Sequence, residues 1–134
     1  MSEAFEYPEL IDRAISAYGN GDGAECIRAG FEAAATRPVT LRANTAKASA
    51  DSVTEALRAA GIGFMRATWY DDAFVLDDGV CERDVWELPI YREGKIYLQS
   101  LSSMLPPLVL EPRTGADALD MCAAPGGKTS QLYA

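Results

Sequence analysis

The chain has 134 residues, of which 49% are hydrophobic and 24% are charged, and its formal net charge is −8. This balance is typical of one globular domain, or of a small domain followed by part of another, and it excludes a disordered or fibrous chain. The acidic net charge argues against a simple nucleic-acid clamp, because neutralising phosphates requires clustered Lys and Arg.

Two helices are predicted at the start of the chain, over residues 7–21 and 21–35. In the first, Pro8 suits an initial helical position and apolar residues recur at helical spacing. In the second, Asp22 and Glu25 have the spacing of a capping pair. We therefore expect a helical segment before the first strand.

A strand and a third helix are predicted next. Residues 38–44 alternate apolar and polar side chains, which is the period of a half-buried strand. Residues 49–62 return to helical spacing, with Ser52 and Glu55 placed as a capping box and Gly61 as the end. The order helices, strand, helix favours an α/β or α+β layer.

The middle of the chain is divided into short apolar runs by Asp, Gly and Pro. Such runs, with this punctuation, predict short strands. Four are expected, over residues 63–70, 73–78, 85–89 and 95–100.

The last third of the chain predicts a helix, a strand and a second helix. Residues 100–112 have helical spacing, but Pro106 and Pro107 should make the helix start or kink there. Residues 114–122 predict a strand introduced by a turn, and residues 126–134 predict the start of a helix.

The stretch DMCAAPGGKTSQ, residues 120–131, has the strongest chemical signal. A strand followed by a turn of small residues and a helix directs unsatisfied backbone N–H groups at one spot, which attracts an anionic group. Gly126 and Gly127 would let a ligand approach the backbone, and Lys128 adds a point charge. Asp120 could bind the loop amides or a cationic ligand group.

Three other interpretations of this stretch remain open. The Pro-Gly pair is often only a turn. A nucleotide-binding P-loop would require a glycine at position 122, where this chain has Cys122. Cys122 could also be a reactive thiol, but no histidine accompanies it, so a small packing residue is the favoured interpretation.

The cysteine and histidine content limits the chemistry further. Cys26, Cys81 and Cys122 are far apart and form no paired ligand set, so neither disulfides nor a metal site is predicted. The chain has no histidine, which removes the commonest general base. No apolar run reaches the roughly 20 residues of a membrane span, and the acidic N-terminus is unlike a signal peptide, so we expect a cytoplasmic protein.

Basic residues are concentrated in one part of the chain. Between positions 37 and 66 there are five basic residues against two acidic ones, whereas positions 71–93 carry eight acidic residues against two basic ones. Solvated surface is the ordinary interpretation of such runs. A basic face on an acidic body, including Arg42, Lys47 and Arg58, is the alternative. Arg42 could equally be a charge that protects a sheet edge from pairing.

The sequence resembles the Nol/Nop/Sun family of RNA (cytosine-5) methyltransferases in three places. ALDMCAAPGGKTSQ, residues 118–131, is similar to the family's first S-adenosylmethionine motif. GKIYLQSLSSMLPPLVLEP, residues 94–112, resembles the segment that precedes this motif. TLRANTAKAS, residues 40–49, resembles the Arg-x-Asn-Thr signature. These stretches follow the family's order along the chain.

The resemblance implies a fold class, α/β, and a division into three parts. An N-terminal helical segment would span residues 1–36, and a small α/β module of ferredoxin-like character that helps to hold RNA would span residues 37–94. Residues 95–134 would then be the start of a doubly wound methyltransferase domain. The resemblance also implies an S-adenosylmethionine site at Cys122, Ala123, Ala124, Pro125, Gly126, Gly127 and Lys128.

The catalytic cysteines of the family lie further along than this chain extends, next to Pro, Ser or Thr. Such a thiolate attacks carbon 6 of the cytosine and makes carbon 5 nucleophilic. We therefore expect no catalytic residue here and interpret the chain as an N-terminal fragment of an enzyme acting on rRNA or tRNA. The fragment should be inactive alone and bind the cofactor weakly or not at all. A non-catalytic RNA-binding or protein-interaction module, with Arg42 and Lys47 facing RNA, is the alternative.

Overall fold

The computed structural model describes residues 9–18 and 22–134 of the chain. The chain divides into two compact units, residues 1–37 and residues 38–134. Pro8 lies outside the described residues, so its predicted place in the first helix is not addressed by the structure.

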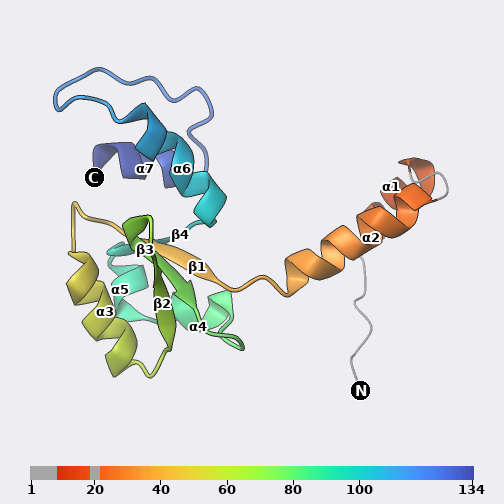
Figure 1. The fold of residues 1–134 in the computed structure, drawn as a ribbon, viewed down its shortest axis with the longest axis horizontal. Coiled ribbons are helices and arrows are strands. Elements are labelled where there is room, and N and C mark those ends of the chain that lie inside the picture. Colours follow the sequence, from red (N-terminus) through yellow and green to blue (C-terminus); the bar gives the residue numbers. More distant parts are fainter. Residues whose placement is uncertain (1–8, 19–21) are drawn as a thin grey trace. The chain divides into compact units, whose positions relative to one another are not determined.

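The first unit contains two helices, α1 over Glu9–Tyr18 and α2 over Asp22–Ala35 (Figure 1). Both were predicted. Asp22 and Glu25 occupy the first turn of α2, where negative charge is favourable against the helix dipole. Arg28 and Asp12 form an ion pair of 3.6 Å between the two helices.

The second unit is built on a four-stranded sheet of order β2-β3-β1-β4, in which every pair is antiparallel. Its strands are β1 (Thr40–Ala43), β2 (Phe64–Ala67), β3 (Tyr70–Leu76) and β4 (Ile96–Leu98). Helix α3 (Ala50–Ala59) joins β1 to β2, and the short helices α4 (Glu82–Trp86) and α5 (Pro89–Arg92) join β3 to β4. This order of elements is the ferredoxin-like βαββαβ arrangement, so the expected ferredoxin-like character is confirmed.

One face of the sheet carries the main hydrophobic core. Leu41, Phe74 and Ile96 project from the strands onto this face and pack with Val53 and Leu57 of α3. Each of these side chains is at most 3% exposed. Alternate positions of β1, β3 and β4 therefore fix α3 against the sheet.

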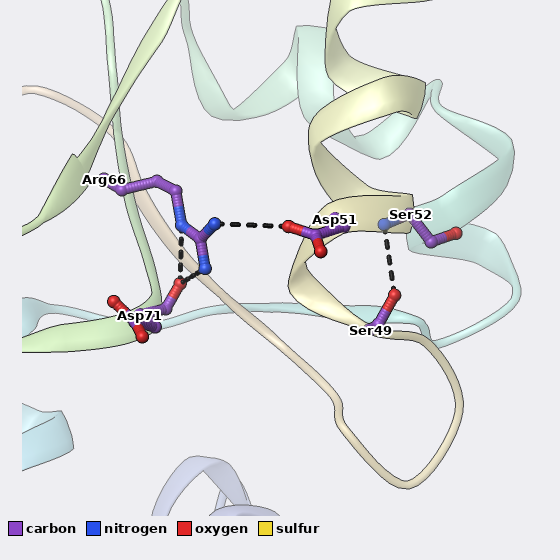
Figure 2. Close-up of polar contacts among 5 residues, drawn as sticks. All are labelled: Ser49, Asp51, Ser52, Arg66 and Asp71. Carbon is purple, nitrogen blue, oxygen red and sulfur yellow. Dashed lines mark hydrogen bonds and ion pairs between the residues drawn. The ribbon is translucent and has the colours of Figure 1, made fainter.

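The N-cap of helix α3 lies three residues before the predicted cap residue, Ser52. Ser49 is the N-cap, and its side chain accepts a hydrogen bond of 3.2 Å from the backbone N–H of Ser52 (Figure 2). The predicted box of Ser52 and Glu55 was wrong because Ser49 is the last extended residue and the helix begins at Ala50, which places Ser52 inside the first turn. Gly61 adopts a φ of 72° just after the helix, which agrees with its predicted role as the end.

The strand predicted over residues 85–89 was also wrong, because these residues belong to α4, the turn after it and the start of α5. The backbone N–H of Cys81 donates to the Asp84 carboxylate at 2.8 Å, which stabilises the first turn of α4. Val85 is buried whereas Trp86 is 43% exposed. Pro89 occupies the first turn of α5, where its missing N–H is not needed.

The opposite face of the sheet is partly covered by two more helices, α6 (Leu101–Leu110) and α7 (Gly127–Tyr133), which pack side by side (Figure 1). Met104 of α6 packs on Ala67 and Ala73 of the sheet in a second apolar cluster. Strand β4 lies beyond the boundary expected at residue 94, yet Ile96 pairs with Ala43 in the ferredoxin-like sheet.

Helix α6 runs through both of its prolines. It begins at Leu101, ahead of Pro106 and Pro107, and not at them. Pro107 has no N–H to donate to the carbonyl of Ser103, but the Gln99 side chain donates to that oxygen instead, at 3.1 Å. A glutamine from the end of β4 therefore compensates for the missing helical bond.

Residues 114–122 form no strand, which corrects the prediction of a first methyltransferase strand. Leu119 and Met121 are 86% and 87% exposed. In the described residues β2 and β4 are the edge strands of the sheet, and residues 114–122 pair with neither of them. An apolar strand needs a paired neighbour for its backbone groups, so the segment remains extended or turned.

Candidate functional site

The loop before α7 is a sharp corner of small residues. The peptide bond between Ala124 and Pro125 is cis, Gly126 has a φ of 108°, and α7 begins at Gly127. The corner and the helix start are where the sequence predicts them. The corner lies against β4, because the Tyr97 hydroxyl donates to the Pro125 carbonyl at 2.8 Å.

Asp120 ties the start of this loop to α7. One of its carboxylate oxygens accepts from the backbone N–H of Cys122 at 2.9 Å, and the other accepts from the Thr129 hydroxyl at 2.7 Å. These hydrogen bonds, that of Thr129 foremost, lower the pKa of Asp120 below its ordinary value. Of the two roles open to Asp120, the structure shows the one in which it binds a loop amide.

Glycine is required at positions 126 and 127 of the loop for two different structural reasons. Gly126 has a backbone conformation that residues with a side chain rarely adopt. A Cβ on Gly127 would lie 3.2 Å from a ring carbon of Tyr97 and 3.3 Å from the side-chain carbonyl carbon of Gln99. The absence of a side chain at Gly127 therefore allows α7 to approach β4 closely. The expected role of Gly127, in which a ligand approaches its backbone, is a separate one.

An open pocket of about 190 Å³ lies between this loop and β4. Small-molecule sites usually have volumes of about 300–1,000 Å³, so this pocket would hold one end of a drug-sized ligand. All seven predicted cofactor residues line it, together with side chains from β4 and the start of α6. The lining consists of Tyr97, Leu98, Gln99, Ser100, Ser103, Cys122, Ala123, Ala124, Pro125, Gly126, Gly127 and Lys128.

Arg42 is fully buried at the centre of the sheet, since β1 lies between β3 and β4. Its guanidinium donates to the Ala43 carbonyl at 2.9 Å, the Ser130 hydroxyl at 3.0 Å and the Gln99 side-chain oxygen at 3.3 Å. Burial lowers its pKa, and nearby Tyr70 and Asp72 oppose that shift. This position argues against the RNA contact expected of Arg42, and the alternative of an edge-strand charge is wrong.

Lys47 and Asn44 hold the turn that leads into β4. The Lys47 ammonium donates to the Glu93 carbonyl at 3.0 Å, and the Asn44 side chain donates to the Gly94 carbonyl at 2.8 Å. A Cβ on Gly94 would lie 2.8 Å from the Lys47 nitrogen, so the Lys47 side chain packs closely against this turn. Lys47 remains exposed, so its contact with RNA stays a prediction.

The basic run over residues 37–66 is largely used within the fold. Figure 2 shows Arg66 between Asp51 and Asp71: its guanidinium donates to the Asp71 carbonyl and lies 3.4 Å from the Asp51 carboxylate. Arg66 also lies over the Phe74 ring, 5.6 Å from its centre. Arg37 and Arg58 are exposed. Any basic face must therefore be smaller than the sequence run indicates.

No group of three or more His, Cys, Asp or Glu side chains that could hold a metal ion occurs in the described parts of the chain. Cys26, Cys81 and Cys122 are free and exposed. In the ranges that the structure describes, no helix is long and apolar enough to cross a membrane.

Sequence reasoning missed the side chains that hold the loop from below, chiefly Tyr97, Gln99 and Gln131. Gln99 and Gln131 are buried and donate or accept across elements: Gln99 donates to Gln131 at 3.1 Å, and Gln131 donates to the Met104 carbonyl at 2.9 Å. Tyr97 and Gln99 alternate with Ile96 and Leu98, which was the available signal.

Comparison with known proteins gives a consistent result. Residues 8–81 match the family described as "Methyltr_RsmF/B-like, ferredoxin-like domain". The chain is 38% identical over 99 residues to a 26S rRNA (cytosine-C(5))-methyltransferase of Caenorhabditis elegans, which covers 73% of this chain and 15% of the relative. It is 33% identical over 133 residues to ribosomal RNA small subunit methyltransferase B of Xylella fastidiosa, which covers 98% of this chain and 30% of the relative.

Among solved structures, a methyltransferase homologue from Pyrococcus horikoshii matches with a TM-score of 0.63 and 38% identity, covering 72% of this chain and 31% of the homologue. The chain therefore spans less than a third of the length of each of these three proteins.

Proposed function

The chain belongs to the RsmF/B-like methyltransferase family through its ferredoxin-like domain. We propose that it forms part of an S-adenosylmethionine-dependent RNA (cytosine-5) methyltransferase. The substrate would be a cytosine of rRNA, since the relatives are named for rRNA. A tRNA substrate is the alternative to rRNA, and a cytoplasmic location belongs to the same proposal. The observation that carries the proposal is the loop of small residues that lines a pocket above β4.

The loop residues fit one end of the cofactor. Residues 123–127 carry only small side chains and one proline, so their backbone is accessible from the pocket. Gly126 has a backbone conformation that would be strained for a residue with a side chain. S-adenosylmethionine supplies the methyl group when bound. The role proposed for residues 122–128 is to bind its methionine and ribose end, with Lys128 adding charge at the rim.

Cys122 belongs to this binding loop and is not proposed as the nucleophile. Its backbone N–H is engaged by Asp120, and it is followed by Ala123. The chain contains no histidine that could act as its base. The thiolate that attacks carbon 6 of the cytosine is therefore assigned to a part of the enzyme outside these residues, and the chain alone is expected to be inactive.

The cofactor assignment can be tested by following backbone amide signals of the chain during titration with S-adenosylmethionine. We expect weak binding, in the millimolar range, with the shifts concentrated at residues 122–128. The same titration with magnesium ATP should leave these signals unchanged, because Cys122 occupies the position where a P-loop needs glycine. Shifts with ATP instead would favour nucleotide binding, and no shifts with either would remove the cofactor from the proposal.

Two glycines with positive φ provide a matched pair of variants. Gly126→Ala should abolish the response to S-adenosylmethionine, since its φ of 108° lies in the loop itself. Gly115→Ala places a similar strain at a φ of 82° in a turn that does not line the pocket, and it should retain the response. Equal loss in both would indicate general loosening of the segment.

The alternative, a non-catalytic RNA-binding or interaction module, shares the ferredoxin-like sheet and differs in the loop. It requires RNA binding without any response of residues 122–128 to the cofactor. The same titration, repeated after adding a short rRNA fragment, distinguishes the two.

A further inference from the structure

We propose that Arg42 is a positioning residue for the cofactor loop, held on the sheet and acting through Ser130. This inference rests on the proposed function only in that residues 122–128 are taken as the cofactor-binding loop. Its physical basis is the buried hydrogen-bond network that joins β1 to α7.

Burial of the Arg42 side chain is costly unless its N–H groups are hydrogen-bonded within the fold. Arg42 is 0% exposed and arginine keeps its charge, so its donors require partners within the fold. Its hydrogen-bond partners include its neighbour Ala43 in β1, Gln99 at the end of β4, and Ser130 in α7. Tyr70 and Asp72 of β3 also interact with it. The contact with Ser130 spans 88 positions of sequence, so it is an attachment between distant parts of the chain and not a local turn contact.

Ser130 connects Arg42 to the loop. The Ser130 hydroxyl, which accepts from Arg42, donates to the Gly127 carbonyl at 3.0 Å. The Ser130 backbone N–H donates to the Gly126 carbonyl at 2.8 Å. The guanidinium is therefore joined, through one residue, to both glycines of the corner that line the pocket.

Two glutamines, Gln99 and Gln131, form a second connection from Arg42 to the helices. Gln99 accepts from Arg42 and donates to Gln131, and Gln131 donates to the Met104 carbonyl of α6. Arg42 thus orients Gln99, and Gln99 reaches both helices, since it also donates to the Ser103 carbonyl. The planar fork of arginine can serve these separated acceptors at fixed angles, whereas a lysine ammonium is a single point of donation.

A merely structural arginine would stabilise the sheet as a whole, whereas a positioning arginine should affect α7 and the loop selectively. Amide hydrogen exchange of the whole chain separates these cases. We expect Arg42→Lys to speed exchange at Ser130 and Gln131 by about tenfold or more, the scale of one lost charge-assisted hydrogen bond. Exchange at Leu41 and Phe74 should change far less.

Arg66→Lys is the matched control. Arg66 also donates to a backbone carbonyl and to an acidic side chain, but it packs on the α3 side of the sheet. This variant should leave exchange in α7 unchanged. If Arg42→Lys fails to fold, Ser130→Ala removes the α7 end of the contact alone and should give the same selective change.

Three outcomes decide the inference. Selective loss of protection in α7 with Arg42→Lys or Ser130→Ala supports it. Uniform loss across β1, β3 and α7, or no loss in α7, overturns it. Titration of the same variants with S-adenosylmethionine is read separately: if the parent chain shows no response, the cofactor proposal fails while the exchange result still decides whether Arg42 holds the loop.

Discussion

The hydroxyl of Tyr97 on β4 donates a hydrogen bond of 2.8 Å to the carbonyl of Pro125, the residue that follows the cis peptide bond of the loop. The same ring is the nearest neighbour that a Cβ on Gly127 would meet. The Tyr97 side chain of the ferredoxin-like sheet thus holds the loop at Pro125 and restricts the size of the residue at position 127.

Tyr97→Phe should loosen the loop with little effect on the sheet. The change removes the hydrogen bond to Pro125 but keeps the ring, so the expected loss of stability is about 1 kcal/mol or less. Urea unfolding measures it, and amide signals of residues 122–128 should broaden or shift. Tyr91→Phe, on a residue that packs against the α3-side core, is the control. Equal loop changes in both variants would contradict the assigned contact.

Gly127→Ala should destabilise the chain, although alanine is the better helix former. The new Cβ would lie 3.2 Å from Tyr97 and 3.3 Å from Gln99, so either α7 or these side chains must move. Gly30→Ala in α2 is the matched control, because nothing lies within 4 Å of its Cβ position. That variant should gain about 0.5–1 kcal/mol from helix propensity. Thermal unfolding of both variants shows whether each change raises or lowers the stability. A gain in stability with Gly127→Ala would refute the close packing of α7 on Tyr97 and Gln99.

Lys47→Gln should weaken RNA binding in a salt-dependent way if Lys47 contacts a phosphate. The slope of log affinity against log salt should then fall by about 1. Arg66→Gln is the control, since Arg66 is engaged by Asp51 and Asp71 and is expected to change the slope less. An unchanged slope with Lys47→Gln would leave Lys47 with only its hydrogen bond to the Glu93 carbonyl.

Asp120→Asn should remove a pH-dependent part of the stability. The pKa of Asp120 is lowered in the folded chain, first by the hydrogen bond from Thr129 and then by that from the N–H of Cys122. A lowered folded pKa stabilises the fold above the unfolded value, and that contribution is lost as the pH falls through the folded pKa. The parent should therefore be more stable than the variant at neutral pH.

The difference between the two proteins should shrink progressively as the pH falls below about 4, the ordinary range of an aspartate. Urea midpoints at several pH values measure it. A constant difference across the whole range would contradict the role given to the Asp120 carboxylate.

Local signals in the sequence predicted much of the fold. The spacing of Val53 and Leu57 and the position of Gly61 were sufficient to predict α3, although not its N-cap, because helical periodicity and the glycine end depend on neighbours in sequence. The small residues before Gly127 were likewise sufficient for the corner and the start of α7. The pocket lining from residues 122–128 follows from that corner.

The errors arose where pairing between distant segments decides the structure. Arg42 alternates with Leu41 and Ala43 as an exposed residue would, but β1 is central and α7 covers its second face, so the guanidinium is buried. Residues 114–122 have the composition of a strand without a neighbour to pair with. Neither of these relationships is contained in a short window of sequence. The helix at Val85 is different, because the hydrogen bond from the N–H of Cys81 to Asp84 spans only three positions and was a local signal that the strand prediction overlooked.

We expect docking of α7 to be a late step of folding, because Ser130 lies 88 positions from its partner Arg42. All four strands lie between Thr40 and Leu98, so the sheet can form while the C-terminal segment is still free. Contacts between distant residues close late, because the chain must first lose the entropy of the intervening loop. Refolding should therefore proceed from a sheet whose central arginine is still hydrated to a state in which docking of α7 expels that water.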